Sequence, residues 1–298
     1  MGYINIFIAN YGKVYIDHSQ LRIEGERQQS FPLEDINSVV IENQRVHLSA
    51  YTLAKLAENN TAVFLCDEKH MPMATVLPYN SHSRRLKVLR MQLALKKPLQ
   101  KQLWRDIVVA KILNQAECAA LCGNDCEKLK SIAARVASGD TTHCEAEAAA
   151  VYFKTVFGKF FTRGQENIIN SAMNYGYAII RGIIARTLVA HGLEPNFGLF
   201  HASELNEFNL ADDFIEPFRP MADLFAAKYL DHGRTELDSE VKLDLYNLVN
   251  CDVTVGSERQ PLTYAVEMLV SSYLSCLRQG KGELKLPKLL ELNMHRYE

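Results

Sequence analysis

The sequence predicts an α+β protein, with a small β-rich N-terminal domain over residues 1–80 and a larger all-α domain over residues 81–298. Short runs of β-branched and aromatic residues, separated by turn residues, fill the first part of the chain. After residue 80, apolar residues recur in long segments with the helical period of about 3.6 residues. The turn-type residues Pro78, Tyr79 and Asn80 mark the boundary between the two patterns.

The expected strands of the first domain are short and lie close together in the sequence. Asn10, Tyr11 and Gly12 separate the first two strands and are typical of a hairpin turn. One helix is expected over residues 49–58, with the hydroxyl of Ser49 as its N-cap. These features predict a small antiparallel sheet, with strands at 3–8, 13–16, 38–41, 62–65 and 73–77.

The second domain is expected to consist of helices joined by short loops. Their predicted ranges are 82–97, 99–121, 125–138, 142–157, 165–191, 210–231, 238–248 and 260–279. The remaining residues, 280–298, are basic and interrupted by proline, so we expect a mobile tail there.

The composition is that of an ordinary globular protein, with 48% hydrophobic and 23% charged residues in a chain of 298. No apolar run approaches the roughly 18–20 residues that cross a bilayer, and the start lacks the features of a signal peptide. We therefore expect a cytoplasmic protein without a membrane partner, whose seven cysteines are reduced. Cys118, Cys122 and Cys126 lack the CxxC pair of a zinc site, which favours buried thiols.

Positive charge is concentrated in one part of a chain whose net charge is -2. Nine cations and no acidic residue lie between Glu68 and Asp106. We call residues 84–105 the basic strip, and we predict that it binds the phosphates of DNA. A solvated helix face is the alternative. The cations at helical spacing are Arg84, Arg85, Lys87 and Arg90.

Glu145 is the first of three polar features that stand out in the helical domain. Ala148, Ala149 and Tyr152 follow it at helical spacing, so all four residues share one face, and Glu147 points to the opposite side. Small neighbours allow the carboxylate to lie close to another helix. The alternative is a capping box formed by Thr142 and Glu145.

The second feature is a polar face on the helix predicted over residues 165–191. Asparagines at 167, 170 and 174 share this face with Tyr177 and Arg181. A solvent face usually carries Lys and Glu, which are better helix formers than Asn. We therefore predict that Asn170, Asn174, Tyr177 and Arg181 contact DNA phosphates, with a satisfied internal network as the alternative.

The third feature lies between residues 200 and 220, where His201 precedes a polar loop and Glu216 stands among apolar residues. Taken singly, a structural histidine and an ion pair between Glu216 and Arg219 are the simpler interpretations. Together with Glu145, one histidine and two carboxylates are suitable ligands for Mg²⁺ or Mn²⁺.

These features resemble a known family, the larger integrase subunit of CRISPR adaptation, also called the CRISPR-associated endonuclease, in its type II branch. Glu145-Ala-Glu-Ala-Ala-Ala-Val-Tyr152 resembles the family's E-G-x-A-A-x-x-Y motif, with Ala146 in place of the usual glycine. His201 stands at the position of the family's histidine. The remaining matches are Asn170-Ser-Ala-Met-Asn-Tyr-Gly-Tyr177, with Met173 for leucine in N-x-x-L-N-Y-x-Y, and Asp213-Phe-Ile-Glu-Pro-Phe-Arg-Pro220, in D-x-x-E-P-F-R-P.

The resemblance implies that Glu145, His201 and Glu216 are catalytic and ligate Mg²⁺ or Mn²⁺. It implies insertion of short duplex DNA fragments into a CRISPR array, by attack of a fragment's 3′-hydroxyl on a phosphodiester of the repeat DNA. It also implies a homodimer, formed through the N-terminal domain, that joins a dimer of a small partner subunit. In a type II system the effector nuclease is expected to take part as well.

Two other functions are compatible with the same residues. A metal-dependent DNA nuclease in repair would use the three ligands mainly for hydrolysis. A non-catalytic DNA-binding scaffold would hold them in a structural network, and its DNA binding would be insensitive to a chelator.

Overall fold

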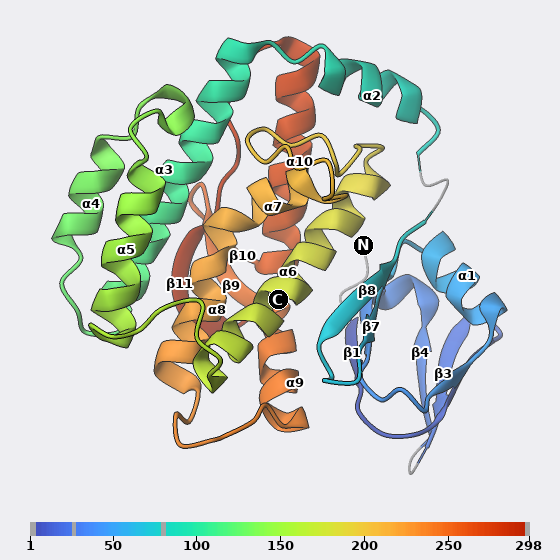
Figure 1. Ribbon diagram of the computed structural model, residues 1–298. Helices are drawn as coiled ribbons and strands as arrows, with labels where there is room; N and C mark the ends of the chain where they lie inside the picture. Colours follow the sequence, from blue (N-terminus) through green and yellow to red (C-terminus); the bar gives the residue numbers. More distant parts are fainter. Residues whose placement is uncertain (1–3, 26–27, 79–81, 296–298) are drawn as a thin grey trace.

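The structure is a computed structural model that describes residues 4–25, 28–78 and 82–295 (Figure 1). It confirms the α+β class, because two small sheets at the N-terminus are followed by a larger, mainly helical region. The first sheet has the order β1-β5-β7-β8 and the second the order β4-β3-β2-β6. The strands are β1 (Ile4–Ile8), β2 (Lys13–Asp17), β3 (Gln20–Glu24), β4 (Gln28–Pro32), β5 (Ile36–Ile41), β6 (His47–Leu48), β7 (Ala62–Cys66) and β8 (Pro72–Val76).

The prediction of one antiparallel sheet is wrong for the first sheet. Strands β1, β5 and β7 run parallel, and β8 alone is antiparallel to its neighbour. Parallel neighbours need crossover connections, which are supplied here by the second sheet and by helix α1 (Ala50–Glu58). The N-cap prediction for α1 is confirmed, because the Ser49 side chain accepts a hydrogen bond from the Thr52 N–H.

The two faces of the first sheet belong to two hydrophobic cores. Val39 and Val63 contribute to a core that includes Leu21 of the second sheet. Phe64 points the other way and packs against the helical region. A Cβ at Gly182 would lie 2.0 Å from the Phe64 ring, so glycine is needed for this close approach. The predicted boundary at residue 80 lies outside the described residues.

The helical region largely follows the predicted ranges, with two corrections. The helix expected over 82–97 ends early, at Leu93. The helix expected over 210–231 is broken by a 3-10 turn at Glu216–Phe218, because Pro217 and Pro220 lack an N–H donor, and it ends in a π turn at Phe225–Tyr229. The helices are α2 (Arg85–Leu93), α3 (Lys97–Leu121), α4 (Glu127–Ala134), α5 (Cys144–Phe157), α6 (Ile168–Ala190), α7 (Asn209–Ile215), α8 (Arg219–Leu224), α9 (Ser239–Asn247) and α10 (Leu262–Gln279).

The prediction of a mobile tail over 280–298 is wrong for residues 288–294, which form a strand. β11 (Lys288–Met294) joins β9 (Cys251–Val255) and β10 (Glu258–Pro261) in an antiparallel sheet of order β10-β9-β11. The buried amide of Asn114 on α3 accepts from the Leu289 N–H and donates to the carbonyls of Pro217 and Pro287. The mainly helical region therefore contains a small sheet that hydrophobic periodicity did not predict.

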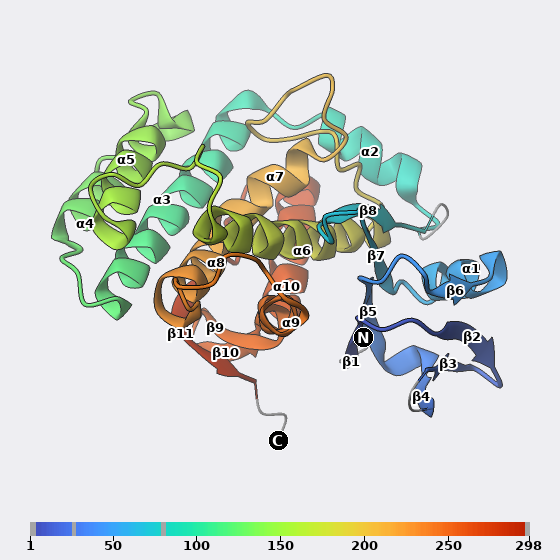
Figure 2. The ribbon, with the colours of Figure 1, turned by 60° about the horizontal axis from the view of Figure 1, so that its bottom comes forward.

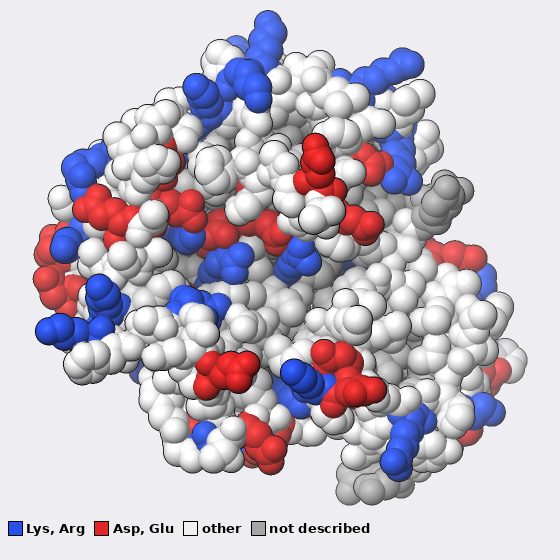
Figure 3. Space-filling view, in the orientation of Figure 1, with Lys and Arg blue, Asp and Glu red and all other residues white. Residues whose placement is uncertain are grey.

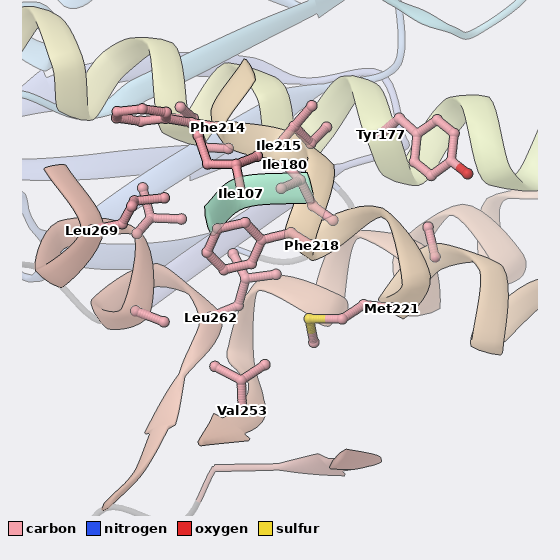
Figure 4. Close-up of a cluster of buried hydrophobic side chains, with 14 of the residues drawn as sticks. Ile107, Tyr177, Ile180, Phe214, Ile215, Phe218, Met221, Val253, Leu262 and Leu269 are labelled. Carbon is pink, nitrogen blue, oxygen red and sulfur yellow. The ribbon is translucent and has the colours of Figure 1, made fainter. Parts of the chain in front are cut away.

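Helix α6 runs through the centre of the helical region, beside α7, α8, α9 and α10 (Figure 2). Figure 4 shows Ile180 of α6 in one apolar cluster with Phe214, Phe218 and Leu269. A Cβ at Gly176 would lie 2.7 Å from Cβ of Ala222, so glycine lets α8 approach α6 closely. The turn at Glu216 packs against α3, and α7 and α8 on either side of it pack against α6. No helix in the described ranges is both long and apolar enough to cross a bilayer.

Candidate functional site

Glu145 lies in the first turn of α5 and faces α3. The carboxylate of Asp140 caps this helix, accepting from the N–H groups of Cys144 and Glu145 at 2.8 and 3.0 Å. The capping-box alternative, with Thr142 as the cap, is therefore wrong. Ala148 is fully buried on the same face, which lets the Glu145 carboxylate approach the side chain of Lys111.

Glu216 reaches the same lysine from the turn between α7 and α8. Lys111 Nζ lies 2.6 Å from Oε1 of Glu145 and 2.5 Å from Oε2 of Glu216. Arg219 Nε lies 2.9 Å from the other Glu216 oxygen. Two carboxylates that are far apart in the sequence therefore converge on one ammonium group.

Burial and charge act in opposite directions on this cluster. Burial alone would raise the pKa of Glu216, but the attraction of Lys111 and Arg219 outweighs it and lowers that pKa. Burial would likewise lower the pKa of Lys111, and the two carboxylates raise it. Glu216 and Lys111 are therefore both charged at neutral pH, although Glu216 is only 4% exposed.

His201 lies in the loop before α7 and is oriented by a buried carboxylate. Its Nδ1 atom is 2.8 Å from Oδ1 of Asp213, which also accepts the His201 backbone N–H. The hydrogen bond that the imidazole donates to Asp213 raises the pKa of His201, and the charge of Glu216 contributes to that rise despite partial burial. The rings of Trp104 and His201 are nearly perpendicular, with 6.1 Å between their centroids. A histidine held through Nδ1 by a carboxylate presents Nε2, as metal-binding histidines do.

The structure brings two of the three predicted ligands together, Glu145 and Glu216, while His201 pairs with Asp213. The carboxylates of Glu145 and Glu216 share one cation, but no group of three or more His, Cys, Asp or Glu side chains within the described ranges is arranged to hold a metal ion. The donor set fits a hard divalent cation, since two carboxylates and an imidazole are ligands of Mg²⁺ and Mn²⁺. Lys111 takes the place between the carboxylates. Sequence reasoning missed it, although it is a single cation in the apolar run 107–113.

A pocket of about 190 Å³ opens beside Glu216, and its lining is rich in cations. Lys111, Arg163 and Arg219 line it together with the aromatic rings of Phe153 and Tyr177. Figure 3 shows basic and acidic side chains meeting in a hollow across the middle of this face. Such a pocket suits an anion such as a phosphate next to the two carboxylates.

A buried network supports the wall of this pocket. Tyr177 and Tyr152 donate hydrogen bonds to the two carboxylate oxygens of Asp223, which is 1% exposed. Burial raises the pKa of Asp223 to about 6, although the tyrosines act in the opposite direction. The Arg219 guanidinium lies over the Tyr177 ring at 4.5 Å, so Asp223 is connected to the Glu216 ion pair. Sequence reasoning missed Asp223 because it looks like an ordinary helical acid.

The side chains predicted on the polar face of α6 mostly have internal partners. Asn170 is 3% exposed and donates to the carbonyls of Thr162 and Gln165. Arg181 pairs with Asp212 at 2.6 Å, which ties α6 to the start of α7. These contacts are those of the internal network that the sequence left as an alternative. DNA binding by Asn170, Tyr177 and Arg181 stays a prediction.

Asn174 differs from these residues because it is exposed on α6. Its Oδ1 atom accepts a hydrogen bond of 2.7 Å from Arg163, one of the cations of the pocket beside Glu216. Contact between Asn174 and DNA also stays a prediction.

The basic strip occupies α2 and the beginning of α3. Arg84, Lys87 and Arg90 are exposed and line a common groove of about 720 Å³ on one side of α2. Arg85 differs from them, because it forms an ion pair of 2.7 Å with Glu194. In Figure 3 the charged side chains that project from the upper edge of the molecule, where α2 lies, are Lys and Arg. The cations at 84, 87 and 90 therefore share a side, as their spacing predicted.

Comparison of the sequence with known proteins places this chain in a family. Residues 6–244 match the family described as CRISPR associated protein Cas1. The chain is 41% identical to the CRISPR-associated endonuclease Cas1 of Neisseria meningitidis serogroup C (strain 8013), over the full length of both proteins. It is 24% identical to the CRISPR-associated endonuclease Cas1 2 of Pyrobaculum aerophilum, covering 80% of this chain and 85% of that protein.

Solved structures show the same fold at lower sequence identity. A casposase bound to integration product superposes with a TM-score of 0.76 at 17% identity, covering 95% of this chain and 93% of the other. A CAS1 protein from Thermotoga maritima gives a TM-score of 0.73 at 15% identity, covering 94% and 99%. A chain of a Cas6-RT-Cas1–Cas2 complex gives 0.72 at 15% identity, covering 93% of this chain and 35% of that chain.

Proposed function

Because the chain belongs to the Cas1 family of CRISPR-associated proteins, we propose that it is a divalent-metal-dependent integrase and endonuclease that inserts short duplex DNA fragments into a CRISPR array. One observation carries the catalytic part of this proposal. Glu145 and Glu216 lie in separate motifs and converge on one cation, beside a pocket lined with further cations. A two-carboxylate site next to an anion pocket is suited to phosphodiester chemistry.

Glu145, Glu216 and Nε2 of His201 would hold the metal, Mg²⁺ or Mn²⁺. When bound, the metal supplies stabilisation of the negative charge that develops on the phosphate and lowers the pKa of the attacking hydroxyl. Asp213 fixes the orientation of the His201 ring through Nδ1. Arg219 neutralises the second oxygen of Glu216, so this buried carboxylate stays ionised and ready to ligate.

The pocket residues would position the target phosphodiester. Arg163 and Arg219 place fixed positive charge where the phosphate oxygens must lie, and Tyr177 and Asp223 hold Arg219 in place. The 3′-hydroxyl oxygen of the fragment forms a bond to phosphorus as the target strand's own P–O bond breaks. No serine or cysteine nucleophile is needed, because positioning and charge stabilisation provide most of the catalysis. Water in place of the hydroxyl would cut the DNA.

The partners follow from the family and from the charges on α2. Duplex fragments would lie along Arg84, Lys87 and Arg90, where phosphate contacts bind DNA without reading its sequence. We propose a cytoplasmic homodimer that joins a dimer of the small adaptation subunit. A Cas1–Cas2 complex among the related structures supports this assembly. The type II effector nuclease would contribute to the choice of fragments.

The test is a strand-transfer assay with the purified protein, a duplex donor with 3′-hydroxyl ends and a repeat-containing target, with and without the small partner subunit. Joined donor–target products in Mg²⁺ or Mn²⁺, and none in chelator, are expected. Hydrolysis without joining, even with the partner, would favour a repair nuclease. Equal DNA binding with no chemistry in metal or chelator would favour a scaffold.

A further inference from the structure

Lys111 takes the position between the two carboxylates of the proposed metal site. It lies in the middle of the long helix α3, and its side chain is 10% exposed. Its ammonium contacts Glu145 at 2.6 Å and Glu216 at 2.5 Å. An ammonium between two carboxylate oxygens has the position and the charge sign of a bound cation, so Lys111 stands in for one.

The charges of this cluster balance without any further ion. The carboxylates of Glu145 and Glu216 are matched by Lys111 and by Arg219. Without Lys111 the two carboxylates would repel each other, and the removal of a partner from a buried charge is strongly unfavourable. Lys111 therefore keeps α5 and the turn at Glu216 together before any metal is bound.

The two cations of the cluster differ in their freedom to move. Arg219 is held by Glu216 on one side and by the Tyr177 ring, 4.5 Å away, on the other. Lys111 has a flexible stem of four carbons and a compact charge. The same lysine lines the pocket of about 190 Å³ beside Glu216, so its ammonium has space to move into.

We propose that Lys111 is a built-in counter-ion of the metal site, which a divalent cation displaces into the neighbouring pocket, where the ammonium can then pair with a phosphate. This proposal rests on the metal site of the proposed function. Metal ligation needs cation–oxygen distances of about 2.0–2.3 Å to the oxygens that Lys111 now contacts. An ammonium and a divalent cation on the same two oxygens would repel each other strongly, so the two binding events compete.

The first test is Mn²⁺ binding to the Lys111→Met variant, which keeps the length of the side chain and removes its charge. In chelator the variant should melt at a lower temperature than wild type. Its Mn²⁺ affinity, measured by isothermal calorimetry, should be about tenfold higher, because no ammonium has to be displaced. Mn²⁺ should also raise its melting temperature by more than that of wild type. Lys97→Met, at the exposed start of the same helix, is the matched control and should bind Mn²⁺ and melt as wild type does.

The second test uses the wild-type protein and does not depend on the variant folding. An amine-reactive acylating reagent is applied in Mn²⁺ and in chelator, and the modification of each lysine is measured by mass spectrometry. Displacement predicts that Mn²⁺ increases acylation of Lys111 several-fold, as its ion pairs are released, and leaves Lys97 unchanged.

The outcomes separate this proposal from the proposed function. If wild type binds Mn²⁺ but Lys111→Met binds it equally or more weakly, the counter-ion proposal is overturned and the metal site stands. Mn²⁺ binding by wild type with unchanged acylation of Lys111 would have the same meaning. Folded wild-type protein that binds no Mn²⁺ would overturn the metal site, and displacement with it.

Discussion

Glu42, at the end of β5, and Lys242, on α9, form a buried ion pair with 3.0 Å between Nζ and Oε1. The two residues are 3% and 5% exposed. Nearby, the hydroxyls of Ser38 and Tyr246 lie 2.6 Å apart. These polar contacts join the first sheet to the helical region across a buried surface, so we expect the two parts to unfold together.

Lys242→Met should destabilise the protein by about 3 kcal/mol, because the buried Glu42 carboxylate loses its lysine cation and keeps the His70 ring, at 3.1 Å, as a partner. Urea unfolding at neutral pH measures this decrease in the free energy of unfolding. The double variant Glu42→Gln with Lys242→Met should recover most of it, since neither charge remains. A single variant as stable as wild type would show that this ion pair does not couple the sheet to α9.

Glu145→Gln and Glu216→Gln should each lower the rate of strand transfer about a hundredfold or more, because each removes charge from the site that stabilises the transition state. Affinity for fragment DNA should change little, since phosphate contacts elsewhere provide it. Glu147→Gln is the matched control. It changes an exposed carboxylate of the same helix that pairs with Arg135 at 2.9 Å, and it should be almost silent. If the Glu147 variant were inactive and the Glu145 variant active, the catalytic carboxylate would lie on the opposite face of α5 from the one proposed.

Arg84→Glu combined with Lys87→Glu should weaken fragment binding equally across unrelated sequences. Removing one cation that binds a phosphate should lower the slope of log affinity against log salt by about one unit. Fluorescence anisotropy over a salt series measures both effects. The control is Lys128→Glu with Lys130→Glu, the same charge change on α4, which lies well away from α2 (Figure 1). If the plots of log affinity against log salt coincide for wild type and the α2 variant, this part of the basic strip is a solvated helix face that does not bind DNA.

Asp223 should make stability depend on pH. Burial raises its pKa to about 6, above the ordinary value of 3.8, so the folded protein keeps a proton that the unfolded chain releases. Stability therefore decreases as pH rises from about 4 through about 6. Asp223→Asn cannot ionise, so its free energy of unfolding relative to wild type should rise by about 3 kcal/mol between those limits.

Denaturant unfolding at several pH values tests the Asp223 prediction. Asp125→Asn, an exposed position, is the control and should follow wild type at every pH. A difference between wild type and Asp223→Asn that does not change with pH would mean that Asp223 titrates in its ordinary range.

The sequence predicted the helices better than the sheets, for physical reasons. Helical periodicity is local, so the positions of α3, α5, α6 and α10 could be predicted closely. Whether strands pair parallel or antiparallel depends on crossover connections, which the spacing of short strands does not reveal. The strand β11 depends on Asn114, a contact partner far away in the sequence. The break at Glu216 could have been predicted from Pro217 and Pro220.

The site could be predicted only where residue types are unusual for their place. Glu145, His201 and Glu216 stood out through matched motifs and through polar groups in apolar surroundings. Lys111 and Asp223 did not, because a single lysine or aspartate on a helix is usually solvated. Their roles depend on burial and on partners from other helices, which appear only in three dimensions.

A crystal of the protein soaked in Mn²⁺, with anomalous scattering used to locate the ion, tests directly whether Glu145, Glu216 and His201 bind one metal. We expect one peak between the carboxylates of Glu145 and Glu216, within about 2.0–2.3 Å of its ligands, with Nε2 of His201 among them and Lys111 moved away. No anomalous peak between the two carboxylates at saturating Mn²⁺, with Lys111 still bridging them, would contradict it.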